Sequence, residues 1–310
     1  MIDYSIIIPH KNIPKLLQRC LDSIPQRDDL EVIVVDDNSD PSIVDFDHFP
    51  GLDRPDTSVF FDKSGKGAGR ARNIGLQHAQ GKWLLFADAD DYLLPSINQV
   101  LNDYSGSTAD IIFFRPRAVM SEDINTPSDR ADRNNALIDD YFRHGGDTRG
   151  LFLWFCPWSK IIRHSIVKGV EFEEISYSND NYFSVIVMCR ARQIDVCETV
   201  YYVATQRADS LTADFMNKEG ELECRAGALL RSFLAASSSG KDVSCLLKEV
   251  KDFSLVLHNR NWSMYAQYVR CLMKNNVSIL QILREQYSKG SFLYRCKGYL
   301  KTCFHLALNR

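Results

Sequence analysis

Residues 31–40 read EVIVVDDNSD, and this stretch decides the fold. Its first half is an apolar, β-branched run, the pattern of a strand that is buried on both faces of a sheet. Its second half is acidic and polar. In open parallel sheets, ligands bind beyond the carboxyl ends of the strands. We therefore expect a parallel sheet with a ligand site at the edge where this strand ends.

Strand-like runs also occur on both sides of this stretch, and helical patterns separate most of them. They are residues 4–8, 59–61, 82–87 and 110–114. Apolar residues recur at helical spacing within 17–24 and 71–79, and Asn12 is expected to cap the first of these helices. Alternating strands and helices predict an α/β fold with a mostly parallel sheet that is flanked by helices.

The pattern changes twice in the rest of the chain. Residues 119–149 are polar and rich in Asp, Arg and Asn, which predicts a surface excursion or lid. From Met216 onward helical patterns dominate, so we expect a helical C-terminal region.

The composition excludes several classes of protein. Of 310 residues, 45% are hydrophobic and the net charge is −3, values typical of a packed globular chain and not of a disordered or nucleic-acid-binding one. No apolar run approaches the ~20 residues of a membrane-spanning helix, and no signal-peptide pattern begins the chain. Nine cysteines without a CxxC pair fit free thiols, so we expect a cytoplasmic protein without a zinc site.

A second acidic cluster, FADADD at residues 86–91, ends another strand-like run. Because the carboxyl ends of parallel strands meet at one edge of a sheet, the two clusters should share one crevice. The carboxylates of Asp88, Asp90 and Asp91 repel one another unless a cation compensates their charge, and hard oxygen ligands suit Mg²⁺ or Mn²⁺. Turn formation or helix capping stays open as the alternative, more so for Asp36 and Asp37.

Between the two clusters, GKGAGRARN at residues 65–73 opens a predicted helix. Glycines at a helix start let backbone N–H groups approach a phosphate, and Arg70 and Arg72 add cationic donors. The stretch matches neither a P-loop nor a dinucleotide-binding fingerprint. Beside two acidic strand ends, it indicates a nucleotide diphosphate that is held together with a metal ion.

Four short motifs, in this order and at this spacing, resemble the motif series of family 2 glycosyltransferases of the bacterial surface-glycan type. They are SIIIP at 5–9, VDDNS at 35–39, ARNIG at 71–75 and DADD at 88–91. The resemblance implies the GT-A fold, a nucleotide-sugar donor and a divalent metal ion, Mn²⁺ or Mg²⁺. One departure is His10-Lys11, where the family usually has Thr or Ser and then Tyr.

The resemblance also implies a role for each residue of the nucleotide pocket. Pro9 and Asn12 would line the pocket, and Asp36 or Asp37 would hold the base and ribose. Arg72 would help to order the nucleotide side.

The metal and the diphosphate receive residues in the same way. Asp88 would reach the ribose, and together with Asp90 it forms a DXD pattern in which Asp90 binds the metal. Residues 201–202 and 207–212 resemble a loop that closes over the diphosphate and acceptor, which makes Arg207 the candidate diphosphate contact.

The middle of the chain resembles the acceptor half of bacterial members. The stretches that carry this likeness are 158–163, 170–172 and Asn179-Asp180. The family usually has Glu-Asp at the last pair and uses the Asp as catalytic base, which makes Asp180 the candidate base here. Taken from the residues alone, an Asp before an apolar segment is more often a helix cap.

The resemblance divides the chain into three parts. Residues 1–115 would be the nucleotide-sugar-binding half of the GT-A domain, 116–215 the acceptor-binding and catalytic half, and 216–310 the helical C-terminal region. The expected activity is inverting transfer of a hexosyl or N-acetylhexosaminyl group, with a UDP-sugar as the default donor. The acceptor would be a glycan or lipid-linked molecule in surface polysaccharide or lipopolysaccharide synthesis.

Two other interpretations stay open. A sugar nucleotidyltransferase shares the sheet and the metal chemistry, but it needs a loop rich in Gly and Arg directly after the first strand, where this chain has PHKN at 9–12. The second is a non-catalytic module that binds a sugar nucleotide.

The end of the chain is basic and amphipathic in pattern. Residues 284–310 contain six Lys or Arg and one Glu, with apolar residues at helical spacing. Such a helix can lie on the anionic inner face of a cell membrane, or it can dock on its own protein and expose its basic side. Both interpretations remain open.

Overall fold

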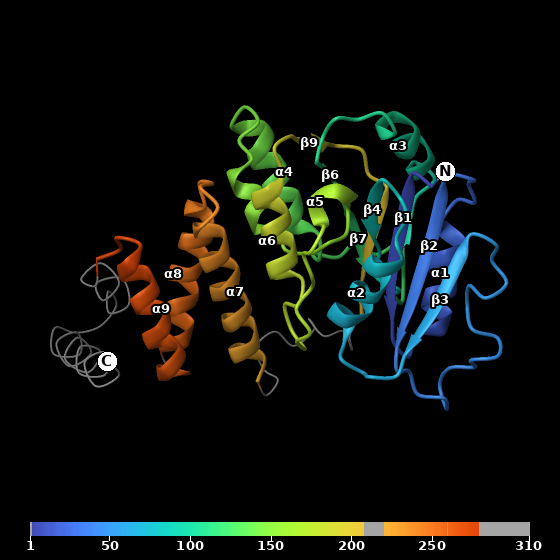
Figure 1. The fold of residues 1–310 in the computed structure, drawn as a ribbon, viewed down its shortest axis with the longest axis horizontal. Coiled ribbons are helices and arrows are strands. Elements are labelled where there is room, and N and C mark those ends of the chain that lie inside the picture. The colour runs from blue at the N-terminus through green and yellow to red at the C-terminus, as the bar shows by residue number, and fades with distance from the viewer. Residues whose placement is uncertain (1, 208–219, 259, 279–310) are drawn as a thin grey trace. The chain divides into compact units, whose positions relative to one another are not determined.

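The computed structural model describes residues 2–207, 220–258 and 260–278 (Figure 1). Contacts divide the chain into two compact units, Met1–Cys224 and Arg225–Arg310. The first unit contains both β-sheets, and the described part of the second is helical.

Ten strands form two sheets in the described part of the first unit. They are β1 (Tyr4–His10), β2 (Leu30–Asp37), β3 (Thr57–Asp62), β4 (Trp83–Phe86), β5 (Tyr92–Leu93), β6 (Ile111–Phe114), β7 (Arg117–Met120), β8 (Lys160–Arg163), β9 (Ile194–Cys197) and β10 (Tyr202–Gln206). The larger sheet has the order β3-β2-β1-β4-β8-β6-β9, and the smaller one has the order β5-β10-β7. In the larger sheet β8 alone runs antiparallel to its neighbours, so the expectation of a mostly parallel sheet is confirmed.

The helices connect these strands and continue beyond them. They are α1 (Pro14–Ser23), α2 (Ala68–His78), α3 (Ile97–Tyr104), α4 (Asp132–Arg143), the 3-10 helix η1 (Arg149–Leu153), α5 (His164–Val167), α6 (Asn181–Arg190), α7 (Glu221–Ser237), α8 (Ser244–His258) and α9 (Trp262–Lys274). Each run predicted as a strand and both predicted helices of the first third occur in the structure.

The neighbouring strands β1 and β2 belong to the core of the first unit. Every residue of β1 is buried, and all but one residue of β2 are buried, as their nearly continuous apolar sequences predict. The two strands run parallel in a register that pairs Ile7 with Ile33 and His10 with Asp36. The polar ends of β1 and β2 therefore meet at the same edge of the sheet.

Asn12 does not cap α1, which corrects the prediction made from the sequence. The helix begins at Pro14 after Ile13, and the N-cap residue Ile13 makes no side-chain cap hydrogen bond. Proline suits the first turn of a helix because its missing N–H would have no partner there. Asn12 instead has a φ of 57°, and its Oδ1 accepts a hydrogen bond from the backbone N–H of Asp40 at 2.7 Å. It thereby joins the β1 end to the loop after β2.

Residues 119–149 are more ordered than a surface excursion. The stretch contains the end of β7 and all of α4, whose Asn134, Leu137 and Ile138 are buried. The sequence looks polar because the remaining side chains of α4 face solvent on an amphipathic helix.

The predicted helical C-terminal region is present as α7, α8 and α9. Aromatic and aliphatic side chains fill its interior, among them Phe233, Leu246, Tyr265 and Tyr268. The hydroxyl of Tyr268 donates to the carbonyl of Ala226 at 2.7 Å, which links α9 to α7. In the described ranges no helix has the length and apolar character that a membrane crossing requires. The whole of the basic stretch 284–310 and the loop residues 208–212 lie outside the described residues.

Gly75 provides a test of how α2 packs against β1. A Cβ at this position would lie 2.4 Å from Cγ2 of Ile7, so α2 and β1 approach at a distance that only glycine permits. Gly75→Ala should lower the free energy of unfolding by about 1–3 kcal/mol, because overpacking a core displaces its neighbours. Urea denaturation measures the change. Gly106→Ala is the control, because a Cβ at Gly106 meets no atom within 4 Å. Equal stability of the two variants would contradict the close approach.

Candidate active site

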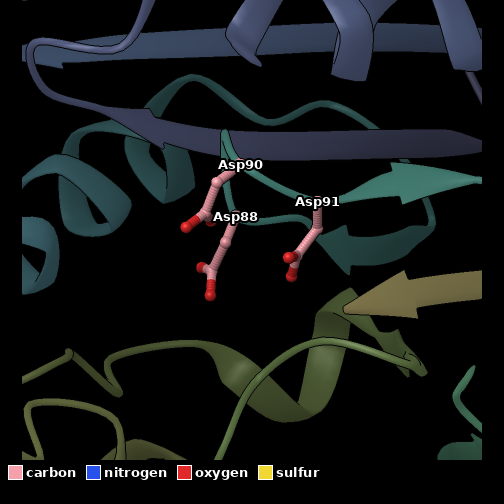
Figure 2. Close-up of side chains that lie close together, drawn as sticks. All are labelled: Asp88, Asp90 and Asp91. Carbon is pink, nitrogen blue, oxygen red and sulfur yellow. The ribbon is translucent and has the colours of Figure 1, made fainter. Parts of the chain in front are cut away.

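The acidic clusters do meet at one edge of the larger sheet. Asp36 and Asp37 end β2, and Asp88, Asp90 and Asp91 follow β4, which lies on the other side of β1. Figure 2 shows the three carboxylates of the second cluster projecting from one turn of the chain. One oxygen from each lies within 4.8 Å of the others. This edge therefore concentrates negative charge and hard oxygen ligands, as the sequence predicted.

Asp91 differs from the other two aspartates because both of its carboxylate oxygens accept hydrogen bonds from the protein. Its Oδ2 accepts from the Tyr202 hydroxyl at 2.5 Å, and its Oδ1 accepts from the backbone N–H of Thr205 at 2.7 Å. Burial raises the pKa of Asp91 to about 8, although the nearby Arg130 opposes the rise. Asp91 thus links the segment after β4 to β10 by hydrogen bonds. Asp88 and Asp90 remain as the pair best placed to hold a metal ion.

Asp90 lies beside a cation that the sequence assigned to the diphosphate. Nε of Arg207 lies 3.0 Å from Asp90 Oδ2. Burial raises the pKa of Asp90, Asp88 raises it further, and the positive charges of Arg130 and Arg207 oppose both effects. The carboxylate pair is therefore a costly arrangement of like charges that needs cations, and a divalent metal ion fits this donor set.

Arg130 is a site residue that the sequence did not reveal. Its Nη1 donates to the carbonyl of Thr205 at 2.9 Å, and its Nη2 lies 3.5 Å from Asp88 Oδ2. It comes from the polar stretch 119–149, where Arg is common and no motif marks it. Only the tertiary contact distinguishes it from the other arginines of that stretch.

Arg72 joins Asp88, a candidate metal ligand, to the segment that carries the candidate base. Its Nη2 donates to Asp88 Oδ1 at 2.7 Å, and its Nη1 donates to Asn179 Oδ1 at 2.9 Å. The guanidinium carbon lies 5.4 Å from the centre of the Phe172 ring. Arg72 is 5% exposed, so the charge of Asp88 is compensated from within the protein.

Asp180 lies directly before α6, yet its side chain does not cap that helix. The carbonyl of Asp180 accepts from the backbone N–H of Ser184 at 3.0 Å, whereas its carboxylate makes no cap hydrogen bond. Burial raises the pKa of Asp180, and the positive charges of Arg72 and Lys160 oppose the rise. The helix-cap interpretation thus lacks the contact that would support it, and a carboxylate of raised basicity remains.

Lys160 is a second residue that the sequence did not single out. It is 3% exposed, and its Nζ donates to the carbonyl of Trp154 at 2.9 Å. Burial lowers the pKa of Lys160 to about 8, while the charges of Cys156 and Asp180 act in the opposite direction. A buried cation therefore lies within electrostatic reach of Asp180.

Asp36 and Asp37 have different surroundings. Asp36 is 1% exposed and accepts a hydrogen bond from Nδ1 of His10 at 2.8 Å. It also accepts from the backbone N–H of Ser39 at 2.9 Å and from the Ser39 hydroxyl at 2.5 Å. Burial by itself would raise the pKa of Asp36, but these hydrogen bonds outweigh it and lower the pKa below its ordinary value. His10 Nε2 accepts from the backbone N–H of Ile13 at 3.1 Å, so the ring proton lies on Nδ1.

Asp37 faces the glycine-rich loop. Its Oδ1 accepts from the backbone N–H of Gly67 at 3.0 Å, and its Oδ2 accepts from Lys11 Nζ at 3.1 Å. Of the two aspartates, Asp37 is the one directed toward the predicted nucleotide side. Pro9 lies inside β1 and pairs with Val35, so it shapes the strand end beneath both carboxylates.

The glycine-rich loop, predicted to approach a phosphate, also contacts another segment of the protein. A Cβ at Gly69 would lie 2.1 Å from the carbonyl oxygen of Glu173, so this glycine lets the 173–179 loop rest on α2. Glu174 forms ion pairs with Lys66, whose Nζ lies 3.0 Å from its carboxylate, and with Arg70, whose Nη1 lies 3.3 Å from it. These cations hold the loop above α2 in the structure.

Comparison with known proteins agrees with this geometry. The family described as "Glycosyl transferase family 2" matches residues 5–168. An uncharacterized glycosyltransferase of Bacillus subtilis (strain 168), EpsJ, is 24% identical over 222 residues, which cover 67% of this chain and 62% of EpsJ. The poly(ribitol-phosphate) β-N-acetylglucosaminyltransferase TarS of Staphylococcus aureus (strain Mu50) is 24% identical over 220 residues, which cover 67% of this chain and 36% of TarS. The chain thus spans less than two thirds of the length of either relative.

Solved structures give the same result for the fold. The crystal structure of S. aureus TarS superimposes with a TM-score of 0.67 at 15% sequence identity, covering 98% of this chain and 54% of TarS. TarS residues 1–349 in complex with UDP-GlcNAc superimpose with a TM-score of 0.62 at 17% identity, covering 98% of this chain and 89% of that one. The mostly parallel sheet, its flanking helices and these superpositions identify the GT-A fold, and the family match establishes that this chain belongs to glycosyl transferase family 2.

Proposed function

We propose that this chain is an inverting, metal-dependent glycosyltransferase that moves a hexosyl or N-acetylhexosaminyl group from a UDP-sugar to a glycan or lipid-linked acceptor. The observation that carries the proposal is the double contact of Arg72, which joins Asp88 of the metal cluster to the residue before Asp180. This contact supports the assignment of the donor-side carboxylates and a basic carboxylate to one site. TarS, named as an N-acetylglucosaminyltransferase and crystallised with UDP-GlcNAc, supports the choice of donor class.

The donor side would hold the nucleotide and its diphosphate. Asp88 and Asp90 would hold Mn²⁺ or Mg²⁺, which when bound neutralises the charge of the leaving diphosphate. Arg207, which contacts Asp90, would add a second positive charge on that side. Asp37, fixed by Gly67 and Lys11, would bind the nucleoside with Pro9 and Asn12 at the ends of β1 and β2.

The acceptor side needs one group that takes a proton. Asp180 would accept the proton of the attacking hydroxyl, and the burial that raises its pKa makes it a stronger base than an exposed Asp. The positive charges of Arg72 and Lys160 keep its ionised form accessible. A single displacement with the base on the face opposite the leaving group inverts the anomeric centre, as in inverting glycoside hydrolysis.

We also propose a cytoplasmic protein that contacts the inner membrane face through its basic C-terminal stretch. The support is the sequence of residues 284–310, with six basic residues and one acidic residue. Removing residues 292–310 should weaken binding to vesicles that contain anionic lipids, most clearly at low salt. Co-sedimentation with such vesicles measures the effect, and neutral vesicles are the control. If the full chain does not sediment with anionic vesicles, the stretch has no such role.

Asp90→Ala tests the metal site. Turnover that depends on Mn²⁺ or Mg²⁺ should be lost, and stabilisation of the protein by UDP should no longer depend on metal. Initial rates and melting temperatures, each with metal and with EDTA, measure both effects. Asp103→Ala, an exposed change on α3, should match the wild type. Full wild-type activity in excess EDTA would exclude a required metal.

Asp180→Asn tests the base. The variant keeps the size of the side chain but loses the proton acceptor, so transfer should fall by about 10²-fold or more. UDP affinity and melting temperature should change little, because the nucleotide contacts lie on the donor side. A near-normal transfer rate would remove Asp180 from the mechanism. Release of UDP, and not of pyrophosphate, would also separate this activity from that of a sugar nucleotidyltransferase.

A further inference from the structure

Asn179 is adjacent to the candidate base in the chain and contacts Arg72. It precedes Asp180 at the position where the resembled family usually has Glu, and its Oδ1 accepts from Arg72 Nη1 at 2.9 Å. The other terminal nitrogen of Arg72 donates to Asp88 Oδ1 at 2.7 Å. Asn179 and the first metal-site carboxylate therefore lie on one guanidinium group.

The chemistry of Arg72 determines which way the Asn179 amide faces. A guanidinium group only donates hydrogen bonds, so the amide atom directed at it must be the carbonyl oxygen. The NH₂ group of Asn179 is consequently directed away from Arg72. Within the part of the chain that the structure describes, no protein group accepts a hydrogen bond from Asn179 Nδ2. Two N–H donors are thus left for another partner.

The backbone holds this amide in a fixed position. The carbonyl of Asn179 accepts from the backbone N–H of Glu173 at 3.0 Å. A Cβ at Gly69 would lie 3.2 Å from the Cβ of Asn179 and 2.1 Å from the Glu173 carbonyl oxygen, so the loop lies directly on the first turn of α2. Together with the Arg72 contact, these restraints preorganise the side chain before any ligand binds.

We propose that Asn179 determines which sugar is transferred, by donating a hydrogen bond from Nδ2 to an oxygen of that sugar. The oxygen is a ring hydroxyl or the carbonyl of a 2-acetamido group. This inference rests on the proposed function, in which the sugar lies between the diphosphate at Asp88 and Asp90 and the base Asp180. Asn179 is linked to both sides of the site, through Arg72 to Asp88 and through the chain to Asp180.

Asparagine changes the polarity of the contact. An ionised Glu would only accept hydrogen bonds, and it would add a negative charge close to Asp88 and Asp180. Asn179 accepts from Arg72 and still offers N–H groups, so it favours an oxygen that has a lone pair directed at it. A site that hydrogen-bonds a substrate group discriminates strongly against analogues without that group, because a polar group is then left unpaired.

Asn179→Asp in the full chain tests this contact. The variant keeps the side-chain shape and an oxygen for Arg72 but loses the Nδ2 donors. Asn102→Asp is the matched control, since Asn102 Oδ1 accepts from Arg27 Nη1 at 2.9 Å in an exposed position on α3. The probes are UDP, UDP-Glc and UDP-GlcNAc, with calorimetric affinities and rates of donor hydrolysis as readouts. Asn179→Ala, which adds no charge, is the second variant, and melting temperatures establish that both are folded.

The ratio of UDP-sugar affinity to UDP affinity is the decisive quantity, because a new charge acts on the diphosphate of every probe. In both Asn179 variants this ratio should fall by about tenfold, the scale of one lost hydrogen bond, while Asn102→Asp leaves it unchanged. A loss confined to UDP-GlcNAc identifies the acetamido carbonyl, and a loss with both sugars identifies a hydroxyl.

An unchanged ratio, or an equal loss for UDP and the UDP-sugars, would overturn the inference, because Asn179 would then act only through Arg72. These outcomes leave the proposed function intact as long as the wild type binds and hydrolyses a UDP-sugar. A wild-type protein that binds and hydrolyses neither UDP-sugar would refute the UDP-sugar donor of the proposed function and this inference together.

Discussion

The site depends on the compensation of negative charge at the end of β4. Three carboxylates lie within hydrogen-bonding range of a common point, and burial makes their repulsion more costly. Arginines from separate segments form ion pairs with these carboxylates and compensate their charge. They are Arg72 from α2, Arg130 from the loop before α4, and Arg207 after β10. Each of these segments is thereby tied to the same few atoms. The architecture around the site follows from this electrostatic requirement.

The two neighbouring aspartates at the end of β2 show how strand position gives adjacent carboxylates different surroundings. The carboxylate of Asp36 accepts hydrogen bonds from His10 and Ser39, so its partners lie within the local structure. Asp37, one residue later, points to the opposite face of the strand, as strand geometry requires, and reaches Gly67 of the glycine-rich loop. Asp90 and Asp91 after β4 also differ in their surroundings, since both carboxylate oxygens of Asp91 accept hydrogen bonds from β10.

Glycine has two mechanical roles in α2. Gly75 lets the helix touch Ile7 of β1, and Gly69 lets the 173–179 loop touch the first turn. The second contact matters for chemistry because that loop leads into Asn179 and Asp180. Gly69 belongs to the glycine-rich sequence that was predicted to approach a phosphate, and in the structure it approaches the backbone of Glu173. The missing Cβ is the property that permits this close approach.

The sequence by itself determined the order of strands and helices along the first third, the sheet edge that carries the site, and the aspartates that lie there. These features are local or follow from a rule about where parallel strands end, so periodicity and short motifs suffice to predict them. The roles of Arg130 and Lys160 were decided only by the tertiary structure. An arginine in a polar stretch and a lysine in a short strand have no distinguishing local signal. Arg130 lies near carboxylates about 40 positions earlier in the chain, and Lys160 is set apart by its burial. The Asn179 amide is the clearest case, since its direction is set by Arg72, 107 positions away, through a contact that no sequence pattern encodes.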